Sequence, residues 1–176
     1  MALPKLNVPE YTTKIPSSGV SIKYRPFLVK EEKLLFLAME TGEQADMITA
    51  VKNILKACTS YKNVDKLSTF DIEYLFLKIR TRSVGENVEV NITCPDDGET
   101  EVPVTIPLDE INVTTNPKHK KEIQLTDEVI LTMGYPSLDL FIQSNFLGET
   151  PGVEQVFELA ASCAESVARF SNSAPK

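Results

Sequence analysis

Few side chains in this chain of 176 residues are placed to do chemistry. His119 is the only histidine, and in the run Lys118-His119-Lys120-Lys121 its cationic neighbours oppose its protonation. The three cysteines, Cys58, Cys94 and Cys163, are widely spaced. Cys58 and Cys163 fall on the apolar faces of expected helices, where a thiol is normally inert. Both a Cys–His dyad and a disulfide framework are therefore disfavoured.

The acidic turn Cys94-Pro95-Asp96-Asp97-Gly98-Glu99 is the second candidate for chemistry. A Cys-Pro-x-Cys-Gly knuckle at a hairpin tip is half of a zinc ribbon, but Asp97 stands where the second thiol belongs. No other cysteine pair or histidine completes the ligand set, so we expect no metal site and no catalytic residue. A small metal-dependent hydrolase that uses Asp96, Asp97 and Glu99 stays as the alternative of another class, with too few ligands for Ca²⁺. A plain turn whose aspartates bond the local backbone is favoured.

Composition narrows the function classes further. Hydrophobic residues make up 42% of the chain, which suits a folded core and is too high for intrinsic disorder. The formal net charge of −7 disfavours nucleic acid and anionic membranes, and it opposes a nucleic-acid-binding role for residues 118–121. The sequence contains no phosphate-binding glycine motif, no apolar run near the roughly 20 residues that span a bilayer, and no secretory signal. We therefore expect no cofactor, no membrane contact and a protein made and used in the cytoplasm.

Residues 1–84 predict a β-hairpin followed by a helical bundle. Strand-like runs at residues 11–15 and 20–24 flank a Pro-Ser-Ser-Gly turn. Apolar residues three and four apart predict helices at residues 29–41, 43–59 and 69–81, and Gly42 ends the first of them. The inward side chains of the second and third helices are predicted to be Ile48, Val51, Leu55, Cys58, Ile72, Leu75, Phe76 and Ile79.

From Gly85 the apolar residues alternate strictly, which is typical of strands. Residues 88–94 and 102–106 predict one hairpin and residues 122–125 and 129–133 a second, together a sheet of about four strands within residues 85–135. Helices are predicted at residues 136–146 and 153–168, in a segment (136–170) that packs back on the bundle, before a flexible tail at 171–176. The predicted fold class is therefore α+β, with an N-terminal β-hairpin and helical bundle, central antiparallel hairpins and C-terminal helices.

The stretch YRPFLVKEEKLLFLAMET, residues 24–41, resembles the N-terminal segment of the T4-type phage baseplate hub proteins. An extended segment closed by Pro26 passes directly into a charged and strongly apolar helix, and weaker similarities follow in SVGENVEV, CPDDGE and FELAASCAESV. The resemblance extends from about Lys5 to about Val167. It implies a structural or assembly component of a contractile-tail baseplate hub that acts by binding other proteins, not an enzyme. A transient tail-assembly chaperone is the alternative of the same class.

The resemblance also implies which proteins the chain binds and where it acts. Other baseplate hub proteins are the expected partners, with copies of the chain itself as a further one, in the host cytoplasm during assembly and in the virion tail baseplate. Leu34, Leu35, Leu37 and Ala38 cover more than one helix face, so the first helix is expected to be buried on two sides, by a core or by a partner. The run Lys30-Glu31-Glu32-Lys33 is expected to be a solvated face or the rim of a partner surface. The candidate partner-binding residues are Phe27, Leu28, Lys30, Lys33 and Phe36.

Overall fold

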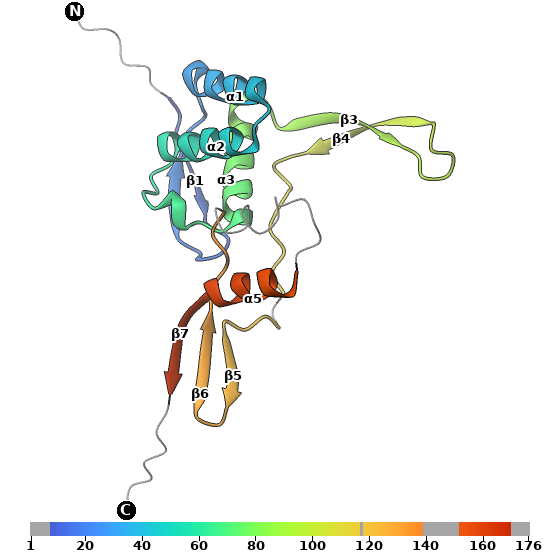
Figure 1. Ribbon diagram of the computed structural model, residues 1–176. Coiled ribbons are helices and arrows are strands. Elements are labelled where there is room, and N and C mark those ends of the chain that lie inside the picture. The colour runs from blue at the N-terminus through green and yellow to red at the C-terminus, as the bar shows by residue number, and fades with distance from the viewer. Residues whose placement is uncertain (1–7, 117, 139–151, 170–176) are drawn as a thin grey trace, which may run out of the picture. The chain divides into compact units, whose positions relative to one another are not determined.

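The computed structural model describes residues 8–116, 118–138 and 152–169, and within them the fold is α+β as predicted (Figure 1). The described strands are short and antiparallel, and they form three separate small sheets. The chain divides into two compact units. The first comprises residues 1–64 and 70–113, and the second comprises residues 65–69 and 114–176.

The first unit opens with the predicted hairpin. Strands β1 (Tyr11–Lys14) and β2 (Ser21–Tyr24) pair antiparallel, with Tyr11 opposite Tyr24. Gly19 in the turn has a φ of 69°, a conformation that glycine adopts without steric cost. The Asp71 side chain, which is fully buried, accepts a hydrogen bond of 2.9 Å from the Ser17 N–H and so ties the turn to the third helix.

Three helices follow: α1 (Val29–Thr41), α2 (Gln44–Cys58) and α3 (Thr69–Ser83), with a short 3₁₀ turn, η1 (Val64–Lys66), before α3. Their predicted bounds are confirmed to within two residues. Gly42 ends α1 in the left-handed conformation, with φ 68°, as predicted. The core of this unit is formed by side chains from the hairpin, α2, the 3₁₀ turn and α3 that are almost fully buried: Ile15, Ile22, Ile54, Leu55, Val64, Ile72, Leu75 and Ile79. Cys58 is buried as predicted, whereas Ile48, Val51 and Phe76 are only half-buried.

The predicted alternating hairpin forms strands β3 (Asn87–Thr93) and β4 (Glu101–Pro107). Val88 lies opposite Ile106, Val90 opposite Val104 and Ile92 opposite Val102, so the apolar side chains share one face. The expected four-stranded sheet is wrong, because β3 and β4 form a two-stranded sheet of their own. Instead of pairing with other strands, they contact chiefly each other.

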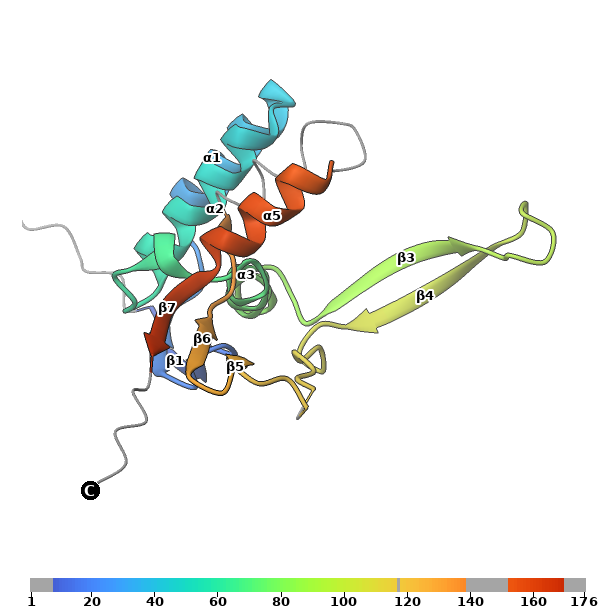
Figure 2. The ribbon, with the colours of Figure 1, turned by 60° about the horizontal axis from the view of Figure 1, so that its bottom comes forward.

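The second unit contains a three-stranded antiparallel sheet. Strands β5 (Glu122–Thr126) and β6 (Val129–Met133) form the second predicted hairpin, and β7 (Ala164–Arg169) pairs with the other edge of β6. Figures 1 and 2 show β7 leaving the end of helix α5 (Val153–Ser162) and lying alongside β6. An isolated bridge pairs Ser68 with Ser137 in the same unit.

The prediction of one helix over residues 153–168 is therefore right for α5 and wrong from Ala164 onward. Local sequence favours helix there, but pairing with β6 gives the backbone of β7 its hydrogen bonds through tertiary contact. Phe157 and Ala160 consequently lie on α5, whereas Val167 lies on β7. The predicted helix at 136–146 lies mostly outside the described residues, as does the predicted tail at 171–176.

Candidate interaction surface

The segment that precedes α1 is held on the rest of the first unit by its backbone. Tyr24 is buried and forms a bridge with Thr59, and the Arg25 N–H donates to the Cys58 carbonyl at 2.9 Å. Pro26 cannot donate a backbone hydrogen bond, and the next N–H, from Phe27, donates to the Ser83 Oγ at the end of α3 at 2.9 Å. These bonds fix the direction in which α1 begins.

Glu31, the third residue of α1, is the most constrained charged side chain of the segment. It is 3% exposed, and its carboxylate accepts hydrogen bonds from the Leu28 N–H at 2.8 Å and from the Arg25 guanidinium at 3.0 Å. The Lys30 ammonium lies 3.4 Å from the same carboxylate. Glu31 therefore satisfies one of the backbone donors that a helix start leaves without a partner and neutralises a half-buried arginine.

Burial alone raises the pKa of Glu31, but the hydrogen bond from the Leu28 N–H and the charges of Arg25 and Lys30 outweigh it and lower the pKa below 4.5. The expectation that the run from Lys30 to Lys33 is solvated is thus wrong for Glu31 and correct for the two lysines, which are exposed. The sequence contains a signal for this role, since a glutamate three residues after the residue at a helix start is one half of a capping box.

The face of α1 opposite Glu31 carries large apolar side chains that are exposed. Val29 is 80% exposed and Phe36 is 58% exposed. They are seven residues apart with Lys33 between them, so the three share one side of the helix, whereas Glu31 and Ala38 are buried on the other. We call Val29, Lys33 and Phe36 the outer face of α1.

An apolar groove of about 230 Å³ lies beside the outer face, between α1 and α2. Leu34 and Leu37, which are 42% and 48% exposed, line it from α1, and Thr49, Ala50 and Asn53 line it from α2. The first helix is expected from the sequence to be buried on two sides, by a core or by a partner. Within the described residues of the first unit, only one side of α1 is buried.

The five candidate partner-binding residues divide into two groups in the structure. Phe27 and Leu28 are half-buried in the segment that precedes α1. The Phe27 N–H donates to Ser83 of α3, and the Leu28 N–H donates to Glu31. Lys30, Lys33 and Phe36 are exposed, although Lys30 is partly engaged with Glu31. Only Lys33 and Phe36 combine exposure with a place on the outer face.

The acidic turn between β3 and β4 is a local hydrogen-bonded structure. The Asp97 carboxylate accepts hydrogen bonds from the N–H groups of Glu99 and Thr100, at 3.0 Å each, and from the Thr100 hydroxyl. The Thr100 hydroxyl and then these N–H groups lower the pKa of Asp97 to about 2. The described residues contain no cluster of three or more His, Cys, Asp or Glu side chains that would hold a metal ion.

The thiols of Cys58 and Cys163 and the His119 imidazole lie in three different local environments. Cys58 is 2% exposed, and burial raises the pKa of its thiol to about 11, which keeps it protonated and unreactive. Cys163 lies between α5 and β7, not on a helix face as expected, and its carbonyl accepts a hydrogen bond from the Gly134 N–H at 2.7 Å. His119 is exposed in the connection before β5.

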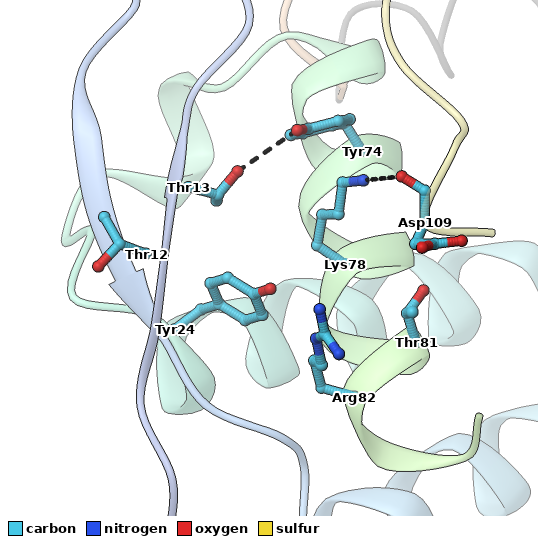
Figure 3. Close-up of a pocket in the computed structure, with 8 residues that line it drawn as sticks. All are labelled: Thr12, Thr13, Tyr24, Tyr74, Lys78, Thr81, Arg82 and Asp109. Carbon is cyan, nitrogen blue, oxygen red and sulfur yellow. Dashed lines mark hydrogen bonds between the residues drawn. The ribbon is translucent and has the colours of Figure 1, made fainter. Parts of the chain in front are cut away.

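A polar cleft of about 350 Å³ lies between the β1–β2 hairpin and α3 (Figure 3). Its two cationic side chains are both engaged: the Lys78 ammonium donates to the Asp109 carbonyl at 2.9 Å, and Arg82 pairs with Glu86 and lies over the Tyr11 ring. Across the cleft, Thr13 and Tyr74 share a hydrogen bond of 3.4 Å. These contacts attach the hairpin and the chain after β4 to α3, and the lining contains no histidine or cysteine.

The described chain thus exposes large apolar side chains on α1 and on the β3–β4 hairpin. The family model described as T4 bacteriophage base plate protein matches residues 8–174. The chain belongs to this family of phage baseplate proteins, and its role is a structural one in the viral tail baseplate, with other baseplate proteins as partners. No curated protein and no solved structure matches the chain. None of the described helices has the length and apolar character needed to cross a membrane.

Proposed function

We propose that the protein is a structural component of the baseplate hub, and that it binds a neighbouring hub subunit through the outer face of α1 and the adjoining α1–α2 groove. The observation that carries this proposal is the exposure of Phe36 and Val29 on a helix whose other face is fixed by Glu31. A few side chains that become buried near the centre of an interface, often aromatic ones, supply most of its binding energy. The resemblance of residues 24–41 to hub proteins supports the hub as the place of action.

Lys33 gives this surface its charged rim. It lies four residues after Val29 and three before Phe36, and it is exposed. Charges at the edge of an interface mainly change the association rate and its dependence on salt. A hub partner with acidic residues around an apolar pocket fits this arrangement.

The test is co-expression of the tagged protein with the other baseplate proteins of the same phage, followed by purification and identification of the bound subunits. Phe36→Ala should lower affinity for the captured hub subunit by about 30-fold, which corresponds to roughly 2 kcal/mol for an interface anchor. The melting temperature should stay close to that of the wild type, because Phe36 contributes little to the core.

Phe157→Ala is the matched control, since Phe157 is also an exposed phenylalanine on a helix, at 70% exposure. A second variant, Lys33→Glu, tests the charged rim. Its control is Lys14→Glu, which reverses an exposed charge on β1. Phe27→Ala and Leu28→Ala are less informative, because their side chains are half-buried at the start of α1 and their loss lowers stability as well.

Capture of hub subunits that is unchanged in Phe36→Ala would refute the proposed surface. Capture of non-hub baseplate proteins alone would refute the hub assignment. Analysis of purified finished tails distinguishes a structural component from a transient assembly chaperone. A structural component remains in the purified baseplate, whereas a chaperone is present in assembly intermediates only.

A further inference from the structure

The β3–β4 ribbon, residues 87–107, has an apolar face that the described chain leaves half open. Ile92 is 49% exposed and Val102 is 43% exposed, and the pairs Val88–Ile106 and Val90–Val104 continue the same face toward the helices. A two-stranded sheet also leaves the outer backbone edge of each strand without a strand partner. The two edges differ in the backbone N–H groups that they direct outward, and the strand register shows which residues these are.

Hydrogen bonds at both ends of the ribbon fix which backbone groups point outward. The Cys94 N–H donates to the Thr100 carbonyl at 2.8 Å, and the Leu108 N–H donates to the Glu86 carbonyl at 2.7 Å. Hydrogen-bonded and non-hydrogen-bonded pairs alternate along an antiparallel ladder. The even-numbered residues of β3 therefore bond across the ribbon, and the odd-numbered residues of β3 and β4 direct their N–H and C=O groups outward.

Two of the outward positions of β4 are prolines. Pro103 lies opposite Asn91 and Pro107 lies opposite Asn87, and neither has an N–H to donate to an added strand. The outward positions of β3 are Asn87, Glu89, Asn91 and Thr93, and all four carry an N–H. The edge of β4 is thus blocked against strand addition, whereas the edge of β3 is open to it.

The charge of the ribbon limits what can dock on that edge. Residues 86–110 contain no lysine, arginine or histidine. Between residues 86 and 101 the chain carries six carboxylates: Glu86, Glu89, Asp96, Asp97, Glu99 and Glu101. Glu89 points to the polar face of the ribbon, where the Glu101 carboxylate also lies and accepts a hydrogen bond from the Asn91 side chain at 3.2 Å. A docked strand meets negative charge on one face and valine and isoleucine side chains on the other.

We propose that the outer edge of β3 binds an extended segment of another baseplate protein by strand addition, and that this segment alternates apolar residues with lysine or arginine. The proposal rests on the proposed function, because it assigns the protein a second binding surface within the same assembly. The backbone of the added strand bonds to Glu89, Asn91 and Thr93. Its apolar side chains extend the Val88–Val90–Ile92 face, and its cations face Glu89 and Glu101.

The first experiment needs no variant. A peptide as long as β3, in which lysine and valine alternate, is added to the full chain, and amide hydrogen exchange is followed by NMR. The N–H groups of Glu89, Asn91 and Thr93 should become protected, while those of Val90 and Ile92 are already protected in the free protein. Binding should weaken as the salt concentration rises.

The second experiment uses a matched pair of proline substitutions. Asn91→Pro removes an outward N–H from the open edge and should weaken peptide binding by about tenfold or more, as expected for a lost backbone hydrogen bond together with the clash of the ring. Thr105→Pro places proline at an outward position of the edge that is already blocked, and it should leave binding unchanged. Both replace an uncharged polar residue on the polar face of the ribbon.

Absence of protection at the β3 edge, protection at β4 instead, or equal losses in both proline variants would each overturn the proposal. The proposed function fails separately. Loss of a hub subunit by Phe36→Ala, with every captured baseplate protein retained by Asn91→Pro, would overturn strand addition and leave the α1 surface standing. Capture that is unchanged in both variants would overturn both.

Discussion

Replacing Glu31 by glutamine should reduce stability far more than its place in a charged run suggests. The carboxylate is 3% exposed and holds the Arg25 guanidinium at 3.0 Å and the Leu28 N–H at 2.8 Å. Glutamine keeps an acceptor for the Leu28 N–H but loses the charge that faces Arg25. Arg25 is 23% exposed and also donates to the carbonyls of Pro26 and Ala57, so the loss is smaller than for a fully buried pair.

We expect a cost of about 2 kcal/mol, in the range for a hydrogen bond to a charged group. For a chain of this length, that corresponds to a fall of roughly 4–8 °C in melting temperature. Glu32→Gln is the control, because the neighbouring carboxylate is only half-buried and makes no ion pair within the described residues. Its melting temperature should change by no more than about 2 °C, as is usual for a surface substitution.

The pH dependence tests the same contact in the wild type. The pKa of Glu31 is lowered in the folded protein, so its stabilisation is fully present above the ordinary value of 4.5 and is lost as the pH falls through the lowered folded value. The gap in unfolding free energy between wild type and Glu31→Gln should therefore be largest near neutral pH and shrink in acid. A gap that does not change with pH, or equal losses in Glu31→Gln and Glu32→Gln, would refute the role given to this carboxylate.

Three further outcomes are expected. Cys94→Ser should leave the circular dichroism spectrum and the melting temperature unchanged, with or without a chelator, because the thiol completes no ligand set; a chelator-dependent fall in melting temperature would contradict this. The Asp97 carboxyl should titrate by NMR with a midpoint near 2, so that its hydrogen bonds persist above that pH and are lost below it; a midpoint near 3.8 would show that the turn bonds are not formed in solution. Light scattering at high protein concentration should show species larger than the 19.6 kDa monomer, because Val29, Phe36 and Phe157 are exposed; a strictly monomeric protein would count against it.

The repeating pattern of the sequence was sufficient to predict most elements of the fold. Apolar spacing of three and four in α2 and α3 places Leu55, Cys58, Leu75 and Ile79 in the core, because helix periodicity alone puts them on one face. Strict alternation and a Pro-Asp-Asp-Gly turn likewise predict the β3–β4 pair. The sequence alone also shows that Asp97 stands where a zinc knuckle has its second thiol.

Tertiary contacts determine three features of the structure that the local sequence pattern does not predict. Residues 164–169 continue a helical pattern, yet they form β7 because β6 offers them a row of backbone partners. Glu31 lies in a run of charges, yet it is buried in the folded chain, where Arg25 lies within hydrogen-bond reach of its carboxylate. The difference between the open β3 edge and the blocked β4 edge likewise depends on register, which determines the outward direction of Pro103 and Pro107. Sequence periodicity predicts which side chains share a face of one helix or strand. Strand pairing and side-chain burial depend on residues from different elements, which come together only when the chain folds.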